Sequence, residues 1–278
     1  MAQRSGFLSN VLHGLRFRAR QLTSGNAKKA GLNRYTVWKL KHLPYNSPHA
    51  IDLKGKTIHF NNGPELWHSI KEIFIEEVYK LPITNPTPYM LDCGSNIGLA
   101  IIYLKTHFPG AHIVGFEPDK TNFSFLQKNI DANNLTNVEL RNEAIWKEDT
   151  TLQFAGEGTH SSRIEEQGNS AGTVEVKATR LKNLLDRKVD FLKMDIEGAE
   201  YEVLKDCGDR LQMIDNLFIE FHGHFNKTHE LTEILQLVEA NNFAYYIREA
   251  AMVYPTPFHR EGQPPYDLQL NIFCFKIS

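Results

Sequence analysis

The sequence predicts an α/β protein built on a mostly parallel, doubly wound sheet, and three observations lead to this prediction. From residue 89 onward, short apolar runs typical of buried strands alternate with segments of helical periodicity. Glycine or acidic residues follow several of these runs, as expected where a strand ends and a ligand crevice opens. No helical segment separates the last two runs, so we expect the final strand to be antiparallel to its neighbours.

An N-terminal α+β extension is expected before the sheet. Its elements are a helix, two strands and a second helix, over residues 5–22, 35–41, 50–60 and 64–80. A turn at Lys54-Gly55-Lys56 divides the second strand, and a proline occupies the first turn of the second helix. Three prolines between residues 82 and 88 then form a stiff connection. We therefore divide the chain into a basic extension and cap, residues 1–85, and a second domain, residues 86–278.

The second domain shows the alternation most clearly. Its expected strands cover residues 89–93, 111–116, 137–141, 189–194, 216–221, 243–248 and 268–276. Its expected helices cover residues 97–107, 119–133, 199–206 and 227–241. Asp119 suits the N-cap of the second of these helices. Residues 144–154 and 173–178 are expected to pair as a hairpin around a loop rich in glycine and serine.

Composition places the chain among reduced, globular proteins. Its 278 residues, 41% of them hydrophobic, suffice for one full α/β domain with an extension. Cys93, Cys207 and Cys274 lack the Cys-x-x-Cys spacing of metal or redox sites. No apolar run approaches the roughly 18 residues of a membrane span, and the N-terminus lacks the apolar stretch of a signal peptide. We therefore expect a cytoplasmic protein.

Charge is distributed unevenly along the chain. Residues 1–60 hold 11 Lys and Arg but 1 acidic residue, a net charge of about +10, which leaves about −12 for the rest. The expected helix at 5–22 has an apolar stripe with most of its arginines outside it, so contact with an anionic membrane is one interpretation. Packing on the chain's own acidic domain is at least as well supported. A third interpretation is an organelle transit peptide, whose composition is similar.

The strongest functional signal is the run 92–98, which reads D-x-G-x-N-x-G where a strand ends. Its glycines allow a tight turn and close approach of a ligand to the backbone. A carboxylate at this turn would repel the pyrophosphate of a dinucleotide, but it would attract the ammonium and sulfonium of S-adenosylmethionine. We therefore expect Asp92, Gly94, Ser95, Asn96 and Gly98 to bind S-adenosylmethionine.

The end of the next strand supports the same cofactor. Glu117 lies where a Rossmann-like sheet places a carboxylate on the ribose hydroxyls, and Pro118 offers an apolar surface to the adenine. Glu143 and Ala144, which follow the third strand, complete the set of residues expected to bind the cofactor. An ordinary turn with Asn96 as a helix cap is the alternative for the first motif alone. The addition of Glu117 favours the cofactor site.

Ionisable residues also follow two later strands, where an open sheet places its ligand crevice. These residues are Lys193, Asp195, Glu197 and Glu200 after one strand, and Glu220, His222 and His224 after the next. We expect Asp195, His222, Glu220 and Lys193 to be catalytic, with Asp195 contacting acceptor and cofactor and His222 as a candidate base. Glu200 is expected only to charge the first turn of a helix. Asp195, Glu220, His222 and His224 also offer metal ligands, but without the spacing of a recognised motif, so a divalent metal stays the less favoured interpretation.

These motifs together resemble the FkbM family of S-adenosylmethionine-dependent methyltransferases. The similarity covers residues 88–275 and includes the run 92–98, Glu117-Pro118 and Ser161-Ser162. Its most specific part is 193–200, which resembles the family's K-x-D-x-E-G-x-E. Leu181-Lys182 departs from the family's Leu-Asp before the fourth strand, which leaves any role of that acid without support.

The resemblance implies a Rossmann-like class I methyltransferase fold that O-methylates a glycan or secondary metabolite. The expected partner is thus a small-molecule or glycan acceptor, and no nucleic acid. Two alternatives stay open at this point. One is a non-catalytic, glycan- or membrane-associated protein with the same fold. The other, a nucleotide-cofactor oxidoreductase, is less favoured because the first turn lacks G-x-G-x-x-G.

Overall fold

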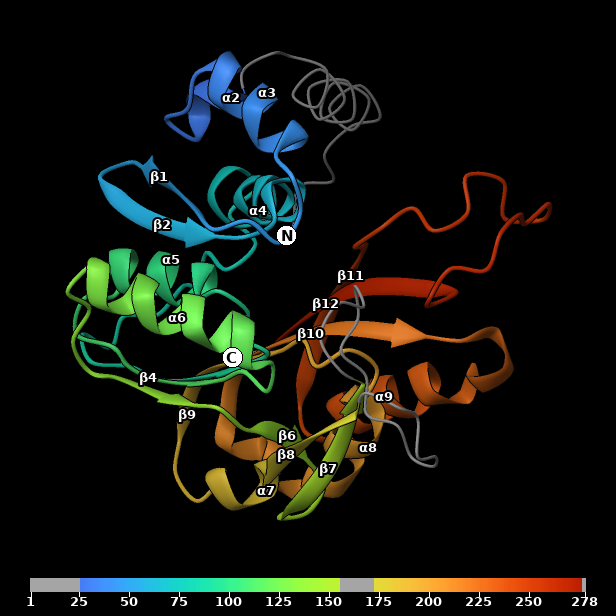
Figure 1. Cartoon of the computed structure of the whole chain (residues 1–278). Coiled ribbons are helices and arrows are strands. Elements are labelled where there is room, and N and C mark those ends of the chain that lie inside the picture. The colour runs from blue at the N-terminus through green and yellow to red at the C-terminus, as the bar shows by residue number, and fades with distance from the viewer. Residues whose placement is uncertain (1–25, 156–172, 277–278) are drawn as a thin grey trace, which may run out of the picture. The chain divides into compact units, whose positions relative to one another are not determined.

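A computed structural model describes residues 26–155 and 173–276, and it divides the chain into two compact units (Figure 1). The first unit ends at Val78 and the second begins at Tyr79. The boundary expected at residues 85 and 86 thus lies just inside the second unit. The helix expected at residues 5–22 and the serines at 161 and 162 lie outside the described residues.

The described part of the first unit consists of helices and one β-hairpin. Its elements are α2 (Asn26–Lys29), α3 (Arg34–His42), β1 (His49–Leu53), β2 (Lys56–Phe60), α4 (Gly63–Ile70) and the π-helical turn η1 (Lys71–Ile75). β1 and β2 pair antiparallel around the expected turn. The strand expected at residues 35–41 is wrong, because this segment lies in α3. Asn33 caps α3 by accepting a hydrogen bond from the Thr36 amide, a local signal that the apolar pattern did not reveal.

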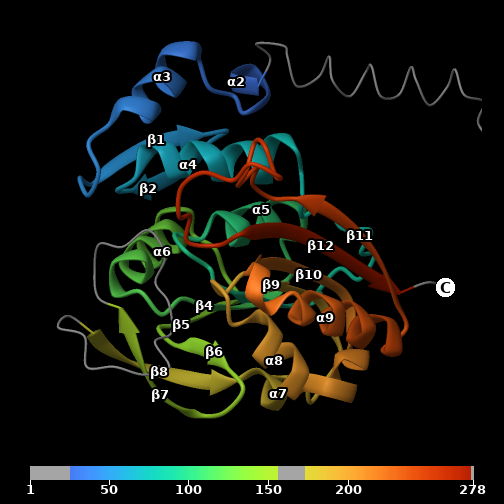
Figure 2. The same cartoon turned by 90° about the vertical axis from the view of Figure 1, so that its right-hand side faces the viewer.

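The second unit contains the predicted doubly wound sheet (Figures 1 and 2). In spatial order its strands are β11 (Phe243–Glu249), β12 (Leu268–Lys276), β10 (Ile214–Gly223), β9 (Val189–Met194), β3 (Tyr89–Cys93), β4 (His112–Phe116) and β5 (Val138–Arg141). β12 is antiparallel to both β10 and β11, and the pairs from β10 to β5 are parallel. The predicted antiparallel last strand is therefore confirmed, with its insertion between two earlier strands as an added detail.

Helices cover both faces of this sheet, as a parallel arrangement requires. Helices α5 (Leu99–His107) and α6 (Lys120–Ala132) cover one face, and α8 (Glu200–Cys207) and α9 (His229–Ala240) cover the other (Figure 2). Asp119 caps α6 as expected, because its carboxylate accepts a hydrogen bond from the Asn122 amide. Short helical segments complete the described set: α7 (Leu181–Leu184), η2 (Gly208–Met213) and η3 (Phe225–Lys227).

A separate small sheet follows the third parallel strand. It consists of β6 (Ala144–Trp146), β7 (Thr150–Ala155) and β8 (Thr173–Arg180). β7 and β8 pair antiparallel, as the expected hairpin requires, while β6 pairs parallel with β8. The expected strand at residues 144–154 is thus two strands, since the chain turns between Trp146 and Thr150.

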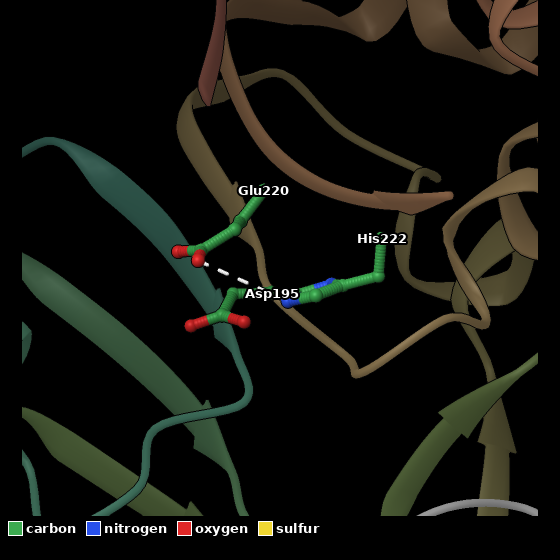
Figure 3. A group of neighbouring side chains, drawn as sticks. All are labelled: Asp195, Glu220 and His222. Atoms are coloured by element: carbon green, nitrogen blue, oxygen red, sulfur yellow. Dashed lines mark ion pairs between the residues drawn. The ribbon is translucent and has the colours of Figure 1, made fainter. Parts of the chain in front are cut away.

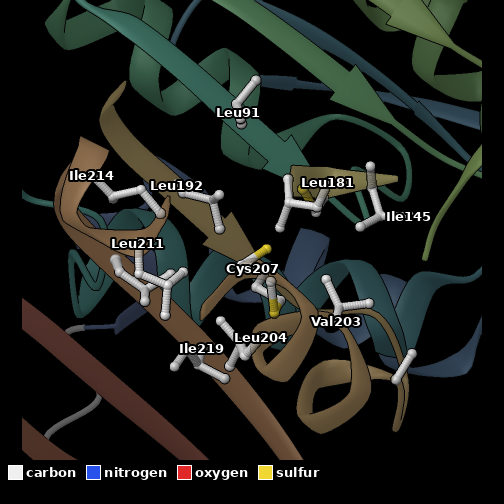
Figure 4. Close-up of a cluster of buried hydrophobic side chains, with 14 of the residues drawn as sticks. Leu91, Ile145, Leu181, Leu192, Val203, Leu204, Cys207, Leu211, Ile214 and Ile219 are labelled. Atoms are coloured by element: carbon white, nitrogen blue, oxygen red, sulfur yellow. The ribbon is translucent and has the colours of Figure 1, made fainter. Parts of the chain in front are cut away.

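A continuous apolar core lies on the face covered by α8 and α9 (Figure 4). It joins Leu91 and Leu192 from the sheet to Val203 and Leu204 of α8, and it extends to Ile145 of the small sheet. This packing fixes the strands from one face, so the residues at their carboxyl ends occupy defined positions. Within the described residues, no helix has the length and apolar character needed to span a membrane.

Candidate active site

The candidate site lies at the carboxyl ends of four adjacent parallel strands, β10, β9, β3 and β4. Each of these strands has, within or just after its last residues, side chains that the sequence marked as functional. Since parallel strands point the same way, these residues gather at one edge of the sheet. The fold thus brings together the expected cofactor residues at the ends of β3 and β4 and the catalytic candidates at the ends of β9 and β10.

The turn after β3 is packed directly against the residues after β9. Gly94 adopts a φ of 84°, in the left-handed region, and a Cβ at this position would overlap the carbonyl oxygen of Asp195. The amide of Asp195 donates a hydrogen bond of 3.1 Å to the Cys93 carbonyl. Only glycine therefore fits at position 94 without moving the backbone that carries Asp195.

Asp92 is fully buried at the base of this turn. Neither of its carboxylate oxygens accepts a hydrogen bond from the described residues, and the nearest cation, the Lys193 ammonium, lies 3.5 Å away. Burial raises the pKa of Asp92, against the opposing charge of Lys193. A buried carboxylate without hydrogen-bond donors is unusual, and it fits a site that meets a cationic ligand.

The remaining residues of the turn have separate roles. Ser95 is buried and its hydroxyl donates to the Asp92 carbonyl, which closes the turn. Asn96 adopts a left-handed φ of 48°, and Gly98, not Asn96, occupies the N-cap position of α5. The interpretation of Asn96 as an ordinary helix cap is therefore wrong.

Glu117 connects this turn to the end of β4. Its carboxylate accepts hydrogen bonds of 2.8 Å from the Asn96 amide and 2.9 Å from the Asp119 amide. Burial nevertheless raises the pKa of Glu117 to about 8. Asn142 holds the next turn in place, since its side-chain amide donates to the carbonyl oxygens of Glu117 and Pro118. Each Glu117 oxygen keeps a lone pair for a hydroxyl donor, which fits a ribose.

Lys193 is buried between the two halves of the site. Its ammonium donates to the Gly94 carbonyl at 2.7 Å and to the Asp195 carboxylate at 3.2 Å. Burial alone would lower the pKa of Lys193, but the charges of Asp195 and Asp92 raise it well above the ordinary value. With 5% of its side chain exposed, Lys193 is placed to brace the turn. This placement favours a structural role for Lys193 over the predicted catalytic one.

Asp195, Glu220 and His222 converge from the ends of β9 and β10 (Figure 3). One ligand-type atom from each residue lies within 4.8 Å of the others. The Nε2 atom of His222 is 3.8 Å from a Glu220 carboxylate oxygen. The predicted cluster of catalytic candidates is thus brought together, with His222 buried and the two carboxylates partly exposed. His224 lies apart from it, with its Nδ1 3.7 Å from the carboxylate of Asp267.

Glu200 is the residue that sequence reasoning misjudged. It lies in the first turn of α8 as expected, but it is fully buried rather than a surface charge. One carboxylate oxygen lies 3.1 Å from Nδ1 of His222, and the carboxylate also accepts from the amides of Ile196 and Gly198. The second glutamate of K-x-D-x-E-G-x-E was the available signal. Its position at a helix start concealed this role.

The charge of His222 follows from these neighbours. Burial would lower the pKa of the ring, but the carboxylates of Glu200, Glu197 and Asp195 raise it to about 10. The ring therefore carries a proton on each nitrogen at neutral pH. Such a ring cannot accept a further proton, which argues against the predicted role of His222 as general base.

Glu197 lies in a strained loop beside the cluster. It has a left-handed φ of 55°, followed by Gly198 at 97°. The hydroxyl of Tyr266 donates to the Glu197 carbonyl at 2.7 Å, and the Tyr266 ring lies against His222 with 4.6 Å between ring centres. Partial burial and the neighbouring carboxylates raise the pKa of Glu197 to about 7, against the charge of His222. The side chain is 40% exposed, so its carboxylate is accessible to an acceptor.

The last two predicted cofactor residues lie beyond β5. Ala144 is buried in β6. The Glu143 carboxylate accepts hydrogen bonds from the Lys177 ammonium and the Thr179 hydroxyl of β8, which lower its pKa against the effect of partial burial. Both residues are therefore tied to the small sheet, and their contact with a cofactor stays a prediction.

Comparison with known proteins finds relatives that are named as methyltransferases. A 29% identical relative over 198 residues, the hexuronic acid methyltransferase AglP of Haloferax volcanii, matches 66% of this chain and 78% of its own length. "Methyltransferase 1" of Beauveria bassiana is 28% identical over 176 residues, 54% of this chain and 71% of its own. The crystal structure of methyltransferase FkbM from Methylobacillus flagellatus superposes with a TM-score of 0.46 at 16% identity, covering 77% of this chain and 54% of that one.

The family model decides the assignment. The model of the methyltransferase FkbM domain matches residues 92–245, which is more than half of the chain. The matched segment begins at Asp92 and includes Glu117, Asp195 and His222. The chain therefore belongs to the FkbM family of methyltransferases.

Proposed function

We propose that this protein transfers a methyl group from S-adenosylmethionine to a hydroxyl of a sugar-type acceptor. The observation that carries the proposal is the gathering of the Asp92 turn, Glu117 and the Asp195 cluster along one sheet edge. The first two fit the cationic and ribose parts of the cofactor. The third is a polar cluster next to them, where an acceptor hydroxyl can be held.

In this proposal each half of the site has its own task. Glu117 accepts hydrogen bonds from the ribose hydroxyls, and Asp92 provides negative charge for the ammonium or sulfonium. When bound, the cofactor supplies a methyl group already activated by its positively charged sulfur. Asp195, which is joined by backbone contacts to the cofactor turn, orients the acceptor hydroxyl. Glu197, with its exposed carboxylate beside the cluster, accepts the hydroxyl proton.

A sugar acceptor is favoured by two considerations. The side chains of Asp195, Glu197 and Glu220 offer several oxygen acceptors for the hydroxyl groups of one ligand. The relative from Haloferax volcanii is named for hexuronic acid methylation, and it matches 66% of this chain. We therefore place hexuronic acids and neutral sugars at the head of the acceptor panel.

The test combines cofactor binding with product formation. Calorimetry should show that wild-type protein binds S-adenosylmethionine and that Glu117→Ala weakens binding by roughly 1–3 kcal/mol, through loss of the hydrogen bonds between its carboxyl group and the ribose hydroxyls. Glu139→Ala is the control, because this glutamate lies in β5, the strand next to β4, and is exposed. S-adenosylhomocysteine release should appear with at least one sugar of the panel. Unchanged affinity in Glu117→Ala would overturn the cofactor site, and cofactor binding without turnover on any sugar would overturn the acceptor class.

A further inference from the structure

We propose that Asp195, Glu220 and His222 bind one divalent cation, and that this cation binds the acceptor hydroxyl groups. The second half of the proposal rests on the proposed function, while the first half stands on the geometry alone. The sequence did not favour a metal here, because no motif spacing joins residues that come from two different strands. The fold supplies the proximity that the spacing does not show.

The first argument is the distance between the three donors. Their ligand-type atoms lie within 4.8 Å of one another, at the ends of the adjacent strands β9 and β10. Oxygen and nitrogen ligands lie about 2.0–2.6 Å from ions such as Mg²⁺ or Ca²⁺, so two ligands of one ion are at most roughly 4–5 Å apart. The cluster is within this limit for an ion of the size of Ca²⁺, and its donors would move together by roughly 0.6 Å to bind Mg²⁺. Figure 3 shows the three side chains pointing toward a common space.

The second argument is independent of that distance, because it concerns the other side of the His222 ring. Histidines that bind metals usually donate their second N–H to a carboxylate, which fixes the ring and the nitrogen that faces the metal. Here the fully buried Glu200 lies 3.1 Å from Nδ1. Nε2 then lies 3.8 Å from a carboxylate oxygen of Glu220 and 3.8 Å from one of Glu197, beyond hydrogen-bond distance of both. Glu200 thus holds the ring as the supporting carboxylate of a metal site does.

The third argument is the balance of charge. Four carboxylates surround this point, those of Asp195, Glu197, Glu200 and Glu220. Lys193 pairs with Asp195 but is shared with Asp92. Such an excess of negative charge favours a proton on His222, and it favours a divalent cation more strongly. Ligation at Nε2 would replace the proton there.

The donor set also indicates the kind of ion. Two carboxylates and one imidazole suit Mg²⁺ or Mn²⁺, which take six ligands. Three protein ligands therefore leave positions for two neighbouring hydroxyls of a sugar. A cation at an acceptor oxygen lowers the pKa of that hydroxyl. The proton of the acceptor hydroxyl passes to Glu197, and a lone pair of the hydroxyl oxygen forms the bond to the methyl carbon. The bond between that carbon and sulfur breaks, and its electron pair stays on sulfur.

The experiment measures Mn²⁺ binding to the full-length protein by the loss of the free-ion electron paramagnetic resonance signal. We expect the wild type to bind one Mn²⁺ ion, which Mg²⁺ displaces. Asp195→Asn and Glu220→Gln should each bind Mn²⁺ at least tenfold more weakly. The control is His224→Gln, because this histidine directly follows β10 but lies next to the carboxylate of Asp267 and apart from the cluster. Thermal melts near that of the wild type would show that the two near-isosteric variants are folded.

Two results would overturn the metal site. One is the absence of Mn²⁺ binding by folded wild-type protein, and the other is binding that survives in both Asp195→Asn and Glu220→Gln. Methyl transfer that proceeds fully in a chelator would overturn the role of the ion in catalysis while leaving the proposed function intact. Conversely, Mn²⁺ binding at this site without methyl transfer to any sugar would support the site and reject the acceptor class.

Discussion

At the scale of single residues, the site depends on carboxylates that are buried for different reasons. Glu200 has three hydrogen-bonding contacts, including His222, whereas Asp92 has none with the described residues. Carboxylates that serve only the fold are usually satisfied by the protein. The contrast therefore separates Glu200, which supports His222, from Asp92, for which we propose contact with a ligand.

Glu117 gives a pH-dependent prediction. Its pKa of about 8 in the folded protein exceeds the ordinary glutamate value, so the stability it contributes is complete below about pH 4.5 and is lost as the pH rises through 8. Glu117→Gln lacks this titration. We expect the free energy of unfolding of the wild type, relative to this variant, to fall by roughly 3–5 kcal/mol between pH 5 and pH 9. Urea denaturation of both proteins across that pH range measures the two free energies of unfolding. A difference between them that does not change with pH would show that burial does not raise the pKa of Glu117.

At the scale of elements, the β3 turn and the end of β9 are in close contact, and in the proposed function this contact sets the spacing between cofactor and acceptor. Gly94→Ala should be destabilising for two reasons, the left-handed φ and the overlap with the Asp195 carbonyl. Gly262→Ala is the control that tests the backbone conformation alone, because Gly262 has a φ of 85° but no atom near its Cβ position. The control should lose about 1–2 kcal/mol from the backbone conformation alone. Gly94→Ala should lose clearly more in urea denaturation, and equal losses would mean that the overlap is relieved without cost.

Most elements of the second unit could be predicted from the sequence. β3 and β9 match the expected ranges, because both strands are buried on both faces and appear as continuous apolar runs. The segment 35–41 could not be assigned correctly, since it lacks a clear apolar stripe and its helix depends on the Asn33 cap. The position of β12 between β10 and β11 could not be predicted either, because strand order depends on packing between distant segments.

The sequence predicted which residues gather at the candidate site, but it did not predict the contacts of each residue. Strand ends identified Asp195, Glu220 and His222 from the sequence, because parallel strands bring their carboxyl ends to one edge. The partner of each side chain was not visible. That Glu200 would lie beneath His222, and that Lys193 would bond the Gly94 carbonyl, depends on side-chain directions that only the folded chain defines.

At the scale of the whole molecule, the basic start and acidic remainder of the chain give a prediction about location. Residues 1–22 lie outside the described residues, and their helix and membrane contact stay predictions. Deletion of residues 1–22 should leave S-adenosylmethionine affinity unchanged, because the proposed cofactor residues all follow residue 91. It should reduce binding to anionic vesicles, most at low salt, since exposed charges are screened over roughly 8 Å at physiological ionic strength. Equal vesicle binding by both proteins at every salt concentration would reject the membrane interpretation.

Tyr266 brings a long loop into contact with the candidate site. It belongs to the connection between β11 and β12, residues 250–267, and it touches both His222 and the Glu197 carbonyl. The sheet constrains the two ends of this connection but not its length or composition, as is usual for loops that carry binding residues. Mutation can therefore rebuild the wall beside the cluster while the turn at Asp92 is left unchanged. In the proposed function, insertions or replacements within 250–267 would therefore change the acceptor that is bound and leave cofactor binding unchanged.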